Sequence, residues 1–145
     1  RGMKAPQFSE DLATLLEQFP DAKVVLTERD REAVVKSAVS LAANQFAIQT
    51  DEADLSEIEA LWRHKIALRE DRVTSALATW DGAVTRLSFD ELNTDWESAI
   101  KRAYRELGLT LTPAARANMR KVMAKSAKGS HTQHSAQLDR FAKQT

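Results

Sequence analysis

Residues 19–30 have the sequence Phe-Pro-Asp-Ala-Lys-Val-Val-Leu-Thr-Glu-Arg-Asp, and this stretch decides the fold. The proline and aspartate end an amphipathic helix, and the β-branched run after them is typical of a buried parallel strand. Asp30 is a suitable N-cap for a following helix, in which apolar residues recur at helical spacing as far as Phe46. This order of helix, strand, tight turn and helix indicates an α/β sheet, in which ligands bind at the turns after the strands.

On either side of this stretch the sequence predicts mostly helix. One helix is expected over residues 9–19 and a long one over residues 54–80, which is capped by Asp54 or Ser56. A second strand is predicted at residues 84–89. Two more helices are expected, one from Asp95 to a C′ glycine at Gly108 and one from Thr112-Pro113 to Met123. Apolar residues that should be buried on the two longest helices include Leu41, Phe46, Leu55, Trp62 and Trp80.

The composition fits a soluble globular protein of one domain or part of one, because 43% of the 145 residues are hydrophobic and 29% are charged. Lys and Arg together number 21, as do Asp and Glu, so no overall positive charge attracts nucleic acid. The absence of cysteine excludes disulfides and thiolate metal sites. Because residues 37–50 are too short and polar to span a bilayer and no secretory signal is seen, we expect a cytoplasmic protein without a membrane span.

The C-terminal residues 111–145 are strongly basic, with seven Lys or Arg residues against one acidic residue. Such a block is usually a solvated face; the alternative is an anion site formed by Lys128, Gly129, His131 and His134. The two histidines lack the companions that a metal site needs, so no metal is predicted. The glycines fit neither a phosphate-binding loop nor a dinucleotide-binding loop, and no nucleophile elbow is present.

Arg29 and Ser37 are the most informative local pair. Arg29 follows the first predicted strand, and Ser37 lies two turns into the next helix. An arginine at a strand end can bind phosphate with two parallel hydrogen bonds, and a nearby serine can add a hydroxyl donor. The alternative is an ion pair of Arg29 with Glu28 or Asp30 beside an ordinary helical serine. Spacing alone leaves both open.

This element and four others resemble segments of the sulfotransferases. The Phe-Pro-Asp-Ala stretch with Arg29-Asp30 and Ser37 resembles the family's 3′-phosphate-binding element. The other four segments occur in the family's order and together extend the resemblance from residue 3 to about residue 141; they are Met3-Lys4-Ala5-Pro6, residues 87–92, residues 106–109 and residues 128–134. The resemblance implies a P-loop-type α/β fold and 3′-phosphoadenosine 5′-phosphosulfate (PAPS) as the sulfuryl donor.

The resemblance also implies a role for each matching residue. Arg29 and Ser37 would hold the 3′-phosphate, and Phe89, which replaces the family's aromatic hydroxyl, would pack on adenine. Lys4 would act in catalysis by neutralising charge on the leaving phosphate oxygen. Four tail residues would close over the 3′-phosphate: Lys128, Gly129, His131 and His134. The general base is unassigned; the nearest candidates are Glu10 and Asp11.

Two departures from the family pattern shape the interpretation. Arg31 stands where the family usually has proline, and the glycine-rich loop that binds the 5′-phosphosulfate in the family is not in these residues. We therefore expect residues 1–145 to be the helix-rich C-terminal part of a sulfotransferase domain, inactive alone. The missing N-terminal half or a second copy would complete it for a small-molecule hydroxyl or amine acceptor. The alternatives are a non-catalytic helical interaction module and a nucleotide-binding accessory domain.

Overall fold

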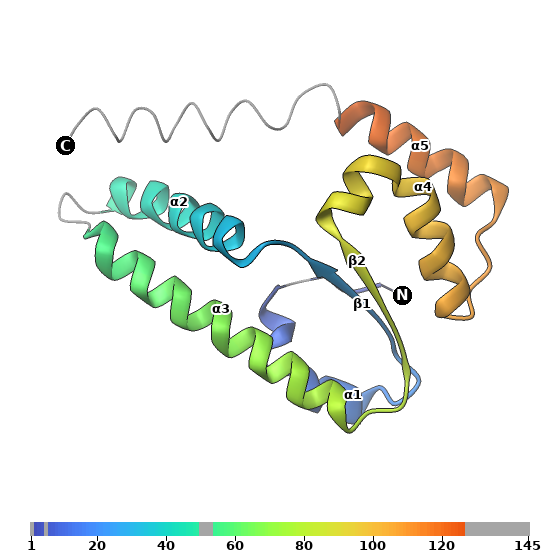
Figure 1. The fold of residues 1–145 in the computed structure, drawn as a ribbon, viewed down its shortest axis with the longest axis horizontal. Helices are drawn as coiled ribbons and strands as arrows, with labels where there is room; N and C mark the ends of the chain where they lie inside the picture. The colour runs from blue at the N-terminus through green and yellow to red at the C-terminus, as the bar shows by residue number, and fades with distance from the viewer. Residues whose placement is uncertain (1, 5, 50–53, 127–145) are drawn as a thin grey trace. The chain divides into compact units, whose positions relative to one another are not determined.

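The computed structural model describes residues 2–4, 6–49 and 54–126 (Figure 1). The chain divides into two parts, residues 1–109 and residues 110–145, and each is described by itself. The first part contains, in order, η1 (Pro6–Ser9), α1 (Leu12–Gln18), β1 (Lys23–Glu28), α2 (Arg31–Gln49), α3 (Leu55–Ala78), β2 (Ala83–Ser88) and α4 (Phe89–Glu106). In the second part the structure describes α5 (Pro113–Ser126). None of the described helices is both long and apolar enough to cross a membrane.

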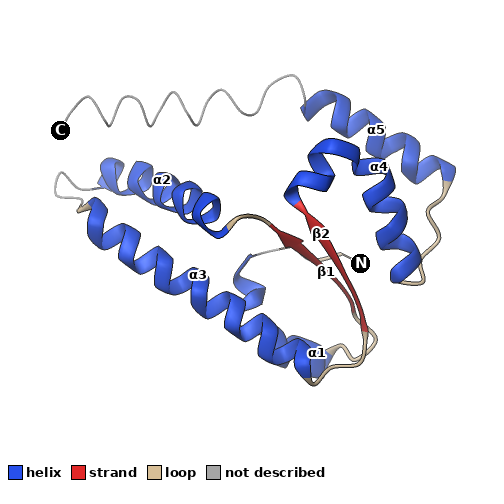
Figure 2. Cartoon of the chain, viewed as in Figure 1, coloured by secondary structure: helices blue, strands red, loops and turns tan. Residues whose placement is uncertain are grey.

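The first part is built around a parallel pair of strands, which confirms the predicted α/β class (Figure 2). In the register of the pair, Lys23 lies opposite Ala83 and Glu28 lies opposite Ser88. Both strands therefore end at the same edge of the sheet, where α2 and α4 begin. The helices α2 and α3 lie side by side and connect β1 to β2.

One face of the sheet is covered by α4, mainly over β2. The buried side chains there are Leu87, Ala99 and Ala103, with Leu92 and Ile100 packed around them. The small alanines let the helix approach the strand closely. Thr85 is also buried, and its hydroxyl donates to Oε2 of Glu106 at 2.5 Å, so the polar group in this interface is satisfied.

The β1 side of the same face is open. Val25 pairs with buried Thr85 in the register, yet 47% of its surface is exposed. In the described residues β1 has a strand neighbour on one side, so it is an edge strand here. Its outer backbone groups lack ladder partners, a feature that favours pairing with another strand.

The predicted capping residues are confirmed, with corrections to some boundaries. Asp30 accepts a hydrogen bond from the amide of Ala33 at 2.8 Å, and Asp54 accepts one from Ser56 at 2.7 Å. Thr112 caps α5 through the amide of Ala115 at 3.1 Å, and α5 continues beyond Met123. Gly108 has φ +61°, and the amide of Leu109 reaches the carbonyl of Tyr104 at 2.7 Å, as in a Schellman motif.

The predicted helix cap at Asp95 is confirmed, but a helical segment before it was not predicted. The helix begins at Phe89 with Ser88 as its N-cap, and Asp95 lies inside it at a kink with φ −147° and ψ 71°. The carboxylate of Asp95 accepts from the amide of Ser98 at 3.2 Å, so it caps the segment after the kink. A capping residue can therefore mark a break within a helix as well as its start.

The buried stripe of the α2–α3 pair agrees with the helical spacing in part. Val35, Ile58 and Ile66 follow that spacing and are buried, whereas Leu41, Phe46 and Leu55 are exposed. Trp62 and Trp80 are half-buried. Apolar residues surround much of α2, and a single neighbouring helix covers only one stripe of such a surface.

Candidate anion-binding site

The carboxyl ends of β1 and β2 and the first turns of α2 and α4 surround an open pocket of about 360 Å³. Its lining residues are Glu28, Arg29, Asp30, Ala33, Ser88, Phe89 and Asp90. Helix N-termini carry partial positive charge and free amide donors, and two of them adjoin this pocket. The turn after β1, predicted as a ligand site, therefore shares its pocket with the turn after β2.

Arg29 connects the two turns. Its guanidinium lies 4.5 Å from the centroid of the Phe89 ring, within the range of a cation–π interaction. The acids that sequence reasoning offered as partners are engaged elsewhere: Glu28 pairs with Arg86, and Asp30 caps α2. Arg29 is thus brought together with Phe89, and the alternative of a local ion pair is not what the structure shows.

Ser37 lies near this site but does not line the pocket. It is exposed on α2, four residues after Ala33, so the two side chains share one face of the helix. Four residues correspond to about 6 Å along the helix axis. A ligand that enters the pocket beside Ala33 and extends along α2 would therefore pass Ser37.

The pocket by itself has too few cations for a phosphate. It contains one arginine and three carboxylates, Glu28, Asp30 and Asp90. The charge of Glu28 is compensated by Arg86, but that of Asp90 opposes an anion. Lys4 is exposed and does not line the pocket. The other predicted binding residues, Lys128, Gly129, His131 and His134, lie outside the described residues.

A second charged cluster, which sequence reasoning missed, joins α3 to Glu10, which lies between η1 and α1. Glu10 accepts a hydrogen bond from Nε of Arg69 at 2.7 Å, and Nζ of Lys65 is 4.0 Å from the same carboxylate oxygen. Both cations lie within 6 Å of the Trp62 ring centroid, Lys65 at 5.7 Å and Arg69 at 5.8 Å. The available signal was Arg69, a charged residue in the apolar stripe between Ile66 and Val73.

This cluster disfavours Glu10 as a general base. The hydrogen bond from Arg69, helped by the charges of Arg69 and Lys65, lowers the pKa of Glu10 below its usual value. A carboxylate with a lowered pKa is a weaker proton acceptor near neutral pH. Asp11 lies at the N-cap position of α1, where its side chain makes no capping hydrogen bond.

A second pocket, of about 410 Å³, lies between β2 and α4, where Thr85, Arg102 and Glu106 are among its lining residues. Arg102 donates to Glu91, to Glu106 at 3.2 Å and to the carbonyl of Arg86 at 3.0 Å. The hydrogen bond from Thr85 lowers the pKa of Glu106. The polar side chains of Thr85, Arg102 and Glu106 in this second pocket therefore have hydrogen-bond partners within the fold. In the part of the chain that the structure describes, no three potential ligands gather as a metal site would require.

Comparison with known proteins identifies one family. A family model described as "Sulfotransferase family" matches residues 2–113 of the 145. The matched span contains both strands, the pocket around Arg29, and Ser37, and it ends before the basic segment at residues 128–134. No match was found among curated proteins or solved structures.

Proposed function

Because the chain belongs to the sulfotransferase family, we propose that it supplies the 3′-phosphate-binding half of a PAPS-dependent sulfotransferase. The observation that carries the proposal is the position of Arg29, an exposed cation in a pocket where two parallel strands end and two helices begin. That arrangement suits a phosphate group, because it combines a guanidinium with free helix amides. The enzyme would transfer a sulfuryl group to a hydroxyl or amine of a small molecule.

In this reaction the acceptor oxygen or nitrogen attacks the sulfur of PAPS. The bond from sulfur to the bridging 5′-phosphate oxygen breaks, and that oxygen leaves with the electron pair as 3′-phosphoadenosine 5′-phosphate. We assign Lys4 to stabilise this oxygen in the transition state. The acceptor proton passes to a base, for which Glu10 is disfavoured by its ion pair with Arg69.

We assign Arg29 and Ser37 to the 3′-phosphate. Phe89 has two ring faces, so it can hold Arg29 on one and pack against adenine on the other. The tail residues Lys128, Gly129, His131 and His134 would add the positive charge that the pocket lacks. An anion in the pocket needs these further cations, because the pocket itself contains one arginine and three carboxylates.

We further propose that the 5′-phosphosulfate half of the site comes from the missing N-terminal half of a P-loop-type sulfotransferase domain or from a second copy. Within the described residues, the outer edge of β1 is unpaired and the side chain of Val25 is exposed. Both support this proposal, since an added strand would pair with the edge, and an element packed on the same face of the sheet would cover Val25.

Calorimetry with Arg29→Ala in the natural full-length polypeptide tests the assignment. We expect 3′-phosphoadenosine 5′-phosphate to bind more weakly by about 1.5–3 kcal/mol, the range for a hydrogen bond to a charged group. Adenosine 5′-phosphate, which lacks the 3′-phosphate, should bind the variant and the parent equally. Arg72→Ala, which removes an exposed arginine of α3, serves as the matched control and should change neither affinity.

Two results would contradict the assignment. An equal loss for both nucleotides would mean that Arg29 supports the fold and does not read the 3′-phosphate. Failure of the parent protein to bind either nucleotide would favour the non-catalytic interaction module.

A further inference from the structure

The turn that carries Arg29 has little apolar support. Residues 29–32 are all exposed, and Val35 is the first buried residue of α2. Apolar packing of α2 therefore begins about one turn after its start. Helix ends without buried contacts open more readily than helix centres. The first turn of α2, which directly follows Arg29 and Asp30, therefore needs contacts other than apolar packing to hold its position.

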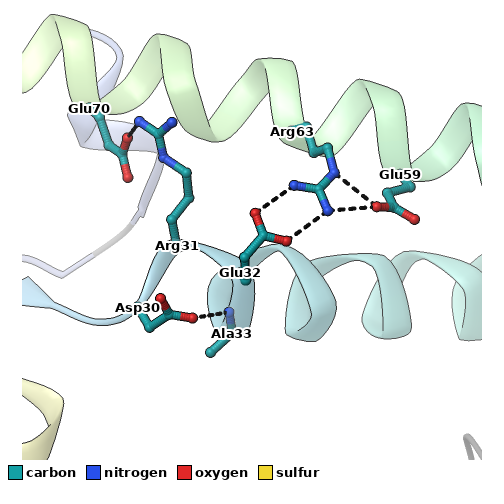
Figure 3. Close-up of polar contacts among 7 residues, drawn as sticks. All are labelled: Asp30, Arg31, Glu32, Ala33, Glu59, Arg63 and Glu70. Atoms are coloured by element: carbon teal, nitrogen blue, oxygen red, sulfur yellow. Dashed lines mark hydrogen bonds and ion pairs between the residues drawn. The ribbon is translucent and has the colours of Figure 1, made fainter.

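Two sets of ion pairs join this first turn to α3 (Figure 3). Arg31 pairs with Glu70. Both oxygens of Glu32 accept hydrogen bonds from Arg63, each at 2.7 Å, and Arg63 also donates to Glu59 at 2.8 Å. Isolated exposed ion pairs contribute little, but a bidentate arginine within a network of charges holds a defined geometry.

We propose that these ion pairs position Arg29 for phosphate binding, and that the Arg31–Glu70 pair takes the place of the family's proline. The inference rests on the proposed function. Proline at the first position of a helix fixes φ near the helical value and so orders the turn before it. Arg31 cannot do so through its backbone, but its side chain ties the same position to α3.

Arg63 has a second effect, on charge. Glu32 lies in the first turn of α2, two residues after Asp30 of the pocket lining, and an uncompensated carboxylate there would oppose the binding of an anion. The hydrogen bonds from Arg63 lower the pKa of Glu32, so the carboxylate stays ionised near neutral pH. Its charge is therefore balanced by the bidentate guanidinium and not by protonation. Arg63 and Arg31 are positioning residues, and neither lines the pocket.

The test compares Arg31→Ala with Arg31→Pro in the natural full-length polypeptide. For Arg31→Ala we expect the Kd for 3′-phosphoadenosine 5′-phosphate to rise about two- to fivefold, as for the loss of an exposed ion pair. Arg31→Pro should restore the parent affinity, and so should the charge exchange Arg31→Glu with Glu70→Arg. Arg72→Ala is the matched control, and binding of adenosine 5′-phosphate should stay unchanged throughout.

Amide hydrogen exchange gives an independent measurement. Exchange at Ala33 and Val34, whose amides bond to Asp30, should be faster in Arg31→Ala and normal in Arg31→Pro. A purely global effect on stability would instead speed exchange throughout α2 and α3, and proline would not reverse it. The difference between parent and Arg31→Ala should shrink in about 1 M salt, because salt weakens solvent-exposed ion pairs.

The inference alone is overturned if Arg29→Ala weakens binding while Arg31→Ala binds and exchanges like the parent. It is also overturned if Arg31→Pro behaves like Arg31→Ala. If Arg29→Ala leaves nucleotide binding unchanged, the proposed function fails and this inference fails with it.

Discussion

The two strand-to-helix turns of the sheet have the same backbone plan but different supports. After β1, Asp30 caps α2, and the first turn of that helix is held by ion pairs to α3. After β2, Ser88 caps α4, and that helix packs on buried Leu87 through Ala99 and Ala103. The first turn presents an exposed arginine, whereas the second presents the ring on which that arginine lies.

This difference indicates that one turn supports the fold and the other serves ligand binding. A turn that is held by an apolar core supports the sheet and tolerates little change. A turn that is held by surface charges keeps its side chains free for a ligand, at the cost of local stability. Arg29 lies on a turn that is held by surface charges, and Phe89 lies on a turn that is held by the apolar core. The role of each residue therefore depends on the other turn.

The largest effect should come from the open side of β1. We expect residues 1–145 expressed alone not to form a stable monomer, because in the part of the chain that the structure describes the outer edge of β1 is unpaired and Val25 is exposed, while β2 is covered by α4. Thermal unfolding recorded together with sedimentation checks this. A cooperative transition from a monodisperse monomer would contradict it and would favour a self-contained interaction module.

The next effect contrasts the two turns within the natural full-length polypeptide. Leu87→Ala should lower the free energy of unfolding by about 2–5 kcal/mol, since it opens a cavity under α4. Arg29→Ala, an exposed substitution, should change it by about 0.5 kcal/mol or less. Urea unfolding measures both. Similar losses for the two variants would remove the distinction between a supporting turn and a binding turn.

The smallest expected effect is the response of the first turn of α2 to acidic pH. The folded-state pKa of Glu32 lies below its ordinary value of 4.5, so its contribution is present above that value and is lost as pH falls through the lowered pKa. We expect amide hydrogen exchange at Ala33 and Val34 to become faster as the pH is lowered from about 6 to about 3, after correction for the intrinsic exchange rate. The increase should be smaller at Leu92, because its helix keeps its apolar core. Equal changes at both turns would contradict this.

Much of the fold follows from local signals in the sequence. The strand at residues 23–28, the cap at Asp30 and the glycine at residue 108 were all predictable, because each depends on the chemistry of a few neighbouring residues. The exposed positions of Leu41 and Phe46 were not, because burial depends on how many elements cover α2. Periodicity identifies an apolar stripe but not the neighbour that covers it.

The candidate site was predictable in part. Arg29 was identified from its place after a strand, but its contact with Phe89 requires the register of β1 and β2, which brings residues 60 positions apart to one edge. The ion pairs of Arg31 and Arg63 were missed for the same reason, since their partners lie across the α2–α3 pair. Long-range pairings of this kind leave no local signal in the sequence.

The most direct test of the central claim is a structure of the natural full-length polypeptide with 3′-phosphoadenosine 5′-phosphate bound. We predict that the 3′-phosphate lies within hydrogen-bond distance of the Arg29 guanidinium and the Ser37 hydroxyl, at the carboxyl ends of β1 and β2. Lys128 and His131 should reach the same phosphate. A nucleotide bound elsewhere, with its 3′-phosphate out of reach of Arg29 and with Lys128 on the opposite face, would contradict this prediction.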